Sequence, residues 1–266
     1  MPPTPSTKPN PSESEQSDGT GSNRFLFSVI MDGLYKEPGT LAAITGRPEE
    51  ELRNWASVER AITIRIPVLP LQNFSKGLVF DRDRAESGKA IFVRPLQLAA
   101  VYGRIDLLAI LLKFSDVDEL PEYSGLTALF LSLWFRHLEM VDVLFRQGAH
   151  PSSCSGVNAL HAAAGRGLIR ETTRIIDEYH VEPDVEDTEG ATPTIYALAL
   201  PLEQAIEIID LLRDKGARSD LAFGTEGWTY VELARAMGRE RLALYLEDDR
   251  ESTIGPEQTS DIAIAP

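Results

Sequence analysis

The sequence of 266 residues is poor in cysteine and in long apolar runs. Its single cysteine, Cys154, cannot form an internal disulfide, and Met1 to Gly21 contains no apolar signal segment. We therefore expect no secreted disulfide scaffold, and a reducing compartment, either cytosol or nucleus. The longest apolar stretch, Leu126 to Phe135, is far shorter than the ~20 residues that cross a bilayer, so no membrane span is expected.

Positive charge is also scarce. The chain has 26 Lys and Arg against 41 Asp and Glu, which gives a net charge of −15 with His neutral. Proteins bind nucleic acid mainly by placing Lys and Arg on phosphates, so this balance disfavours sequence-independent binding to DNA or RNA. An acidic body instead favours a partner with an electropositive surface.

The two ends of the chain differ from its middle. Residues 1–22 and 250–266 are predicted to be disordered tails, because their composition cannot bury enough apolar surface to offset the entropy of ordering. The chain as a whole is 43% hydrophobic, which is enough to build a sizeable core between these tails.

An internal repeat organises residues 94–249. Five similar blocks start at intervals of 33, 31, 34 and 37 residues, and four of them have a glycine two positions before the start. Alanines at matched offsets follow four of the starts, and three blocks then have a glycine nine positions after the start, where glycine can end a helix. A second apolar pattern with helical spacing comes next. The blocks start at Arg94, Thr127, Asn158, Thr192 and Thr229.

Each block therefore reads as turn, helix, turn, helix, and the pattern resembles the ankyrin-repeat family, with its T-P-L-H-x-A signature and period of 33. The resemblance implies an all-α solenoid of about five stacked helix-turn-helix repeats with β-hairpin turns. Arg136 and Pro201 replace the helix-end glycine in the second and fourth blocks, which we therefore expect to be distorted.

Residues 23–93 are predicted to form a degenerate opening repeat with a hairpin insertion. Leu41 to Gly46 repeats the spacing from alanine pair to glycine, and Leu52 with Trp55 suits a second helix. The alternation from Ala61 to Val68, followed by the extended run Ala90 to Val93, predicts a β-hairpin.

A partner-binding groove is predicted from the helical register. At 100° per residue, two positions late in each first helix point away from the positions used in stacking, and the turn tips lie beside them. Tyr, Trp and Arg concentrate interface energy, so the aromatic and arginine residues at these places are the candidates. Burial of Trp134 and Phe135 in the core is the open alternative. The predicted groove residues are Tyr102, Tyr123, Trp134, Phe135, Arg166 and Trp228.

The sequence contains no convincing motif for catalysis, metal binding or cofactor binding. Cys154 and His161 lie seven residues apart, but the resemblance implies that His161 ties its turn to its helix by hydrogen bonds. The four histidines lack metal-ligand spacing, and the glycine loops lack the residues of a nucleotide site. No catalytic residue, metal or cofactor is predicted.

The resemblance implies a non-enzymatic module that binds another protein. We expect a regulatory adaptor of the transcription-coregulator type, cytoplasmic or nuclear, whose partner is a protein such as a transcription factor and which uses no small-molecule substrate. Two alternatives remain. One is a direct DNA-binding regulator that uses the helix-turn-helix-like segment 41–55, although Glu49 to Glu51 would repel phosphates. The other is an enzyme built on residues 23–93.

Overall fold

The computed structural model describes residues 46–57, 59–64, 89–122, 125–153, 156–224 and 227–253. The chain divides into two units, residues 1–55 and 56–266, and each is considered by itself. The first unit contains most of helix α3 (Glu49–Ala56), whose first turn carries three glutamates. The segments 23–45 and 65–88 of the predicted opening repeat lie outside the described residues, so its boundaries stay predictions, as does the tail 1–22.

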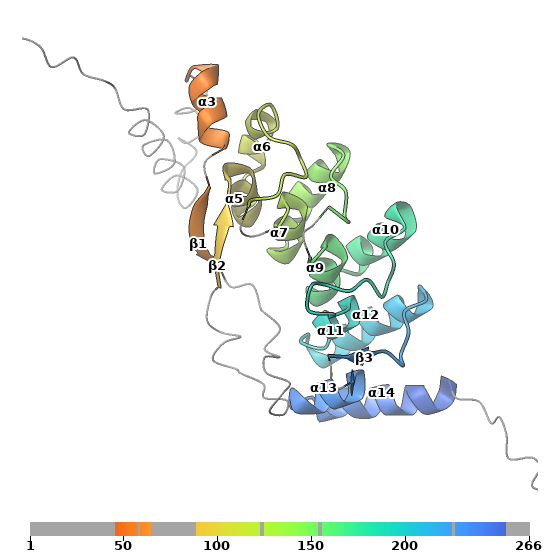
Figure 1. The fold of residues 1–266 in the computed structure, drawn as a ribbon. Coiled ribbons are helices and arrows are strands. Elements are labelled where there is room, and N and C mark those ends of the chain that lie inside the picture. The colour runs from red at the N-terminus through yellow and green to blue at the C-terminus, as the bar shows by residue number, and fades with distance from the viewer. Residues whose placement is uncertain are drawn as a thin grey trace, which may run out of the picture. The chain divides into compact units, whose positions relative to one another are not determined.

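The second unit is built from helix pairs that follow one another in chain order (Figure 1). Each pair corresponds to one predicted block, so the predicted all-α repeat fold is confirmed. The final helix continues past the predicted end of the repeats at Asp249. The pairs are α5 (Pro95–Tyr102) and α6 (Ile105–Leu111), α7 (Ala128–Trp134) and α8 (Leu138–Arg146), α9 (Ala159–Gly165) and α10 (Ile169–Tyr179), α11 (Pro193–Ala197) and α12 (Leu202–Asp214), and α13 (Tyr230–Ala236) and α14 (Glu240–Thr253).

The predicted block starts are the N-caps of the first helices. Arg94, Thr127, Asn158, Thr192 and Thr229 all have extended backbone immediately before the helix. The Thr127 hydroxyl accepts a hydrogen bond from the backbone N–H of Phe130, 3.1 Å away, which satisfies one of the donors that a helix start leaves open. Capping chemistry is local, which explains why the sequence alone locates these starts.

The end of the second block differs from expectation. Arg136 has φ of 61°, close to the 66°, 68° and 69° of Gly103, Gly167 and Gly238 at the matching places. The turn from α7 to α8 therefore keeps the left-handed geometry of its neighbours, and the predicted distortion there is wrong. In the fourth block α11 is only five residues long, and Pro201 directly precedes α12 instead of continuing a glycine turn.

The first helices pack against one another along the stack. Contacts join α5 to α7, α7 to α9, α9 to α11 and α11 to α13. Leucines and alanines fill these interfaces, and Leu129, Leu160 and Ala163 are fully buried. Small side chains on one helix let the backbone of the next approach closely, so the core extends through the repeats instead of closing inside any one of them.

Hydrogen bonds from the first helices bridge separate repeats or loops. The Nε2 of buried His161 lies 3.0 Å from the carbonyl oxygen of Ala191, just before the next helix. Gln97 holds the corresponding position in the first repeat, and its Nε2 donates to the Glu119 carbonyl at 2.9 Å. Two different side chains thus make the same kind of link.

Two short antiparallel strand pairs complete the second unit. Strand β1 (Arg60–Ile64) pairs with β2 (Lys89–Val93), so the two predicted extended runs do associate, with Ile62 opposite Ile91. Strand β3 (Ala222–Phe223) pairs with β4 (Trp228–Thr229) in the turn before α13. Within the described residues, no helix combines the length and apolar character needed to cross a bilayer.

Candidate functional site

The predicted groove residues fall at two different ends of the first helices. Tyr102 and Trp134 are the last residues of α5 and α7, and Phe135 and Arg166 directly follow α7 and α9. Trp228 lies instead in β4, at the start of α13. Tyr123 is outside the described residues. The C-terminal ends of the first helices therefore bring together part of the predicted set, and Trp228 is not part of it.

Trp134 lies between the second and third repeats. Its side chain is only 4% exposed, and its ring is stacked at 4° on Phe130 with 5.9 Å between centroids. Gly165 makes room for the indole, because a Cβ at that glycine would lie 3.3 Å from Cζ3 of Trp134. Trp134 therefore belongs to the core, whereas Phe135 is half-buried beside it.

Arg166 lies over the buried tryptophan. Its guanidinium carbon is 5.4 Å from the centroid of Trp134, within the range at which a cation is attracted to an aromatic face. Its Nε is buried and has no hydrogen-bond partner in the part of the chain that the structure describes. Burial lowers the pKa of Arg166, and the nearby positive charge of Arg136 lowers that pKa further.

Arg136 completes this arrangement, although the sequence reading treated it only as a substitute for glycine. Its Nη1 donates a 2.8 Å hydrogen bond to the carbonyl oxygen of Arg166. The side chain is exposed, and its charge lies at the C-terminal end of α9, where the helix dipole favours a cation. We call Trp134, Phe135, Arg136 and Arg166 the aromatic–arginine cluster. The signal that could have found Arg136 is its charge, next to Phe135 and one repeat before Arg166.

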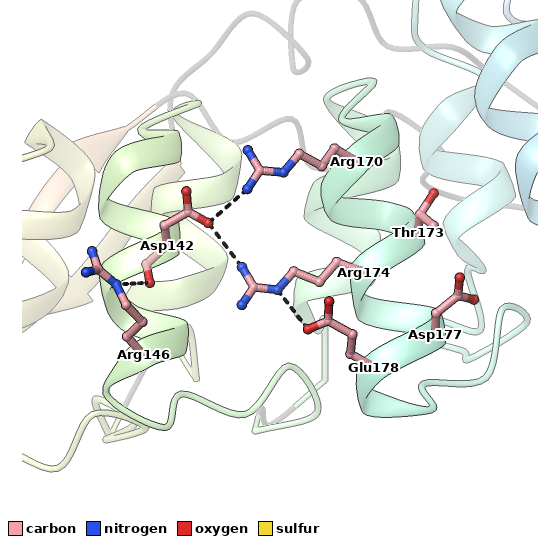
Figure 2. A pocket seen from close by; sticks show the side chains of 7 residues that line it. All are labelled: Asp142, Arg146, Arg170, Thr173, Arg174, Asp177 and Glu178. Atoms are coloured by element: carbon pink, nitrogen blue, oxygen red, sulfur yellow. Dashed lines mark hydrogen bonds and ion pairs between the residues drawn. The ribbon is translucent and has the colours of Figure 1, made fainter.

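A second feature is a pocket of about 550 Å³ between α8 and α10 (Figure 2). Arg174 bridges Asp142 at 3.0 Å and Glu178 at 3.1 Å, and its guanidinium lies 4.2 Å from the ring of Phe145. Arg170 is 72% exposed and reaches Asp142 at 3.5 Å. The sequence reading missed this pocket, which we call the outer charged pocket. Its lining residues are Asp142, Arg146, Arg170, Thr173, Arg174, Asp177 and Glu178.

In the outer charged pocket, ion pairs from Arg170 and Arg174 to Asp142 join neighbouring repeats. Three arginines face three carboxylates, and the paired groups come from both helices, as the dashed lines in Figure 2 show. Opposite charges four positions apart on a second helix, such as Arg174 and Glu178, are the sequence signal for it. Arg174 is thus already paired with carboxylates, and Asp177 is paired with Lys215, which lies outside the pocket lining.

His161 has a structural position. Asn158 caps α9 by accepting hydrogen bonds from the backbone of Leu160 and His161, and the backbone N–H of Asn158 lies 3.2 Å from His161 Nδ1. Burial lowers the pKa of His161, which favours the neutral ring. The implied tie between turn and helix is confirmed. Cys154 lies outside the described residues.

Comparison with known proteins finds the repeat pattern in part of the chain. Residues 96–145 match the family model described as "Ankyrin repeats (many copies)". The chain is also similar to the B-cell lymphoma 3 protein homolog of Mus musculus, with 29% identity over 115 residues. That match covers 42% of this chain and 24% of the mouse protein, so this chain spans about a quarter of the length of its relative. Ankyrin repeats are a protein-interaction module.

Proposed function

We propose that this chain, whose helix pairs are ankyrin repeats, is a non-enzymatic regulatory adaptor that holds another protein at its aromatic–arginine cluster. The observation that carries the proposal is the position of Arg166, a guanidinium over a buried indole whose Nε has no hydrogen-bond partner among the described residues. Such a group is already oriented for binding, so little entropy is lost when a partner contacts it. The neighbouring half-buried Phe135 adds apolar area.

The residue types in the cluster favour protein recognition. Interface energy concentrates in a few aromatic and arginine side chains that are surrounded by well-packed neighbours. Here Trp134 is held by Phe130 and Gly165, and it supports Arg166 in turn. Tyr102, half-buried at the end of α5, extends the proposed surface to the preceding repeat.

The finer proposal is a transcription coregulator that acts through a transcription factor, in the cytosol or nucleus. Its support is the resemblance to a family that includes such coregulators, together with the partial likeness to the B-cell lymphoma 3 protein homolog. Direct DNA reading is the weaker alternative, because the first turn of α3 carries Glu49, Glu50 and Glu51. Adaptor and partner would therefore meet through protein contacts.

Site-specific photo-crosslinking tests the proposal. A photoreactive phenylalanine analogue at position 135, in cells that express the chain, should crosslink a protein that mass spectrometry identifies. The same analogue at Leu244, an exposed apolar residue of α14, is the control. Purified partner should then bind the Tyr102→Asp chain at least about tenfold more weakly than wild type, as expected when an interface anchor is lost.

The outcomes separate the coarse proposal from the fine one. Identical products at both positions, or none, would overturn the proposed surface. A specific product that is not a transcription factor would keep the adaptor and overturn the coregulator. Loss of helical circular dichroism in the Tyr102→Asp variant would assign its effect to folding, and the milder Tyr102→Ser would then replace it.

A further inference from the structure

Arginines follow the first helices of four of the five repeats, and among the described residues only one of the four, Arg104, forms an ion pair. Arg104 is paired with Asp106, with 2.6 Å between Nη2 and Oδ2. Arg239 donates to the carbonyl oxygens of Ala199 and Leu200. Arg136 and Arg166 lie next to each other, and in the described part of the chain neither forms an ion pair with a carboxylate.

The pair is maintained against two unfavourable effects. Arg136 adopts a left-handed backbone that costs a non-glycine residue free energy, at a place where three other repeats use glycine. Arg166 is half-buried, and its Nε is removed from solvent without an acceptor among the described residues. The two adjacent positive charges also repel each other, and a ligand with negative charge would offset that repulsion.

We propose that Arg136 and Arg166 bind an acidic segment of the partner protein, through Asp or Glu side chains. This inference rests on the proposed function and names the chemistry of the bound segment. A guanidinium presents a planar fork of donors that matches a carboxylate, and two adjacent forks suit two closely spaced acidic residues. The partner segment is thus acidic although the chain as a whole has a charge of −15.

The local charge outweighs the net charge at this distance. Exposed charges farther away than about 8 Å are largely screened at physiological ionic strength, whereas a carboxylate in contact with both guanidiniums is not. The outer charged pocket gives the contrast, because Asp142 and Glu178 already neutralise Arg174 there. Arginine is therefore available to bind a carboxylate of a partner in the aromatic–arginine cluster, whereas Arg174 in the outer charged pocket is already paired.

Fluorescence anisotropy of a fluorescein-labelled decaglutamate peptide, titrated with the full chain, tests the inference. The test variant is Arg136→Gly with Arg166→Met. The matched control is Arg146→Met with Arg170→Met, which removes the same charge from exposed positions of the outer charged pocket. We expect the test variant to raise the Kd about tenfold or more, as for lost charge-assisted contacts, and the control to change it less than about twofold.

Three results would overturn the inference. They are absence of saturable binding by wild type, equal weakening in both double variants, and tighter binding of a labelled oligothymidylate that the test variant loses. The last would mark a nucleic-acid surface. Arg136→Gly alone is the control for misfolding, because glycine readily adopts the left-handed backbone found at this position. A partner that crosslinks at position 135 without any decaglutamate binding would leave the proposed function intact and refute only the acidic segment.

Discussion

The aromatic–arginine cluster and the outer charged pocket use the same pair of side-chain types in opposite ways. Each places a guanidinium over a buried aromatic ring, Arg166 over Trp134 and Arg174 over Phe145. In the pocket, carboxylates from α8 and α10 complete the arrangement. In the cluster, the neighbour is another arginine. Cation–π geometry alone therefore does not distinguish a stabilising contact from a binding surface, whereas the charge that surrounds the arginine does.

The largest expected change in stability comes from removing the aromatic rings beneath the two arginines. Trp134→Ala and Phe145→Ala should each lower the free energy of unfolding by about 3–5 kcal/mol, because both rings are buried and leave cavities. Urea denaturation measures this loss. At a temperature where both variants stay folded, only Trp134→Ala should weaken binding of the decaglutamate peptide. Equal binding of the peptide by the two variants would contradict the proposal that only the aromatic–arginine cluster binds it.

Acidification tests the hydrogen-bonded link that His161 makes to the next repeat. Burial lowers the pKa of His161 in the folded state, so the unfolded chain binds more protons once the pH falls through about 6.5. Stability from this group is therefore present above that pH and is lost below it. His161→Gln should remove this loss, since Gln97 already makes the equivalent bonds in the first repeat.

Urea midpoints between pH 8 and pH 5 measure this effect. Wild type should lose more stability on acidification than His161→Gln does, while the two should be similar at pH 8. An identical pH dependence in both chains would mean that His161 does not carry the acid sensitivity. Tyr196, whose ring centroid lies 5.0 Å from that of His161, is present in both chains, so the two chains differ only at residue 161.

The arginines themselves give a smaller and more selective effect. Arg174→Gln should cost about 1 kcal/mol, because Arg174 is 24% exposed and pairs with two carboxylates. Arg166→Gln should change stability by less than about 0.5 kcal/mol, because removing its buried charge offsets the lost ring contact. Denaturation in low and high salt measures both, and high salt should reduce only the cost of Arg174→Gln. Equal costs would contradict the contrast in charge pairing.

The fold was predictable where its determinants are local. Thr127 and Asn158 cap helices through bonds to residues two or three positions away, so their spacing reveals the helix starts. The burial of Trp134 was not predictable in this way. It depends on Gly165, a residue of the next repeat that leaves space for the indole, and this needs the register between repeats.

The candidate site shows the same limit. Arg166 was identified by its helical position, but its unpaired Nε and its closeness to Arg136 are properties of the packed interface. Arg136 was read only as a missing glycine, and a distorted turn was expected from it. The observed φ of 61° shows that the backbone of the repeat, not the residue type, sets this turn. The roles of all six predicted groove residues in binding stay predictions.

Arg136→Gly gives the smallest expected change in stability and the sharpest separation of stability from binding. Left-handed backbone costs a non-glycine residue about 1–2 kcal/mol, and the lost hydrogen bond to the Arg166 carbonyl is worth about 0.5–1.5 kcal/mol. The two nearly cancel, so the midpoint of urea denaturation should stay equal or rise slightly. A fall of more than about 1 kcal/mol would show that Arg136 is retained for the stability of the α7–α8 turn. An unchanged or higher midpoint with weaker binding of acidic peptide would show that it is retained for recognition, the role that separates the cluster from the outer charged pocket.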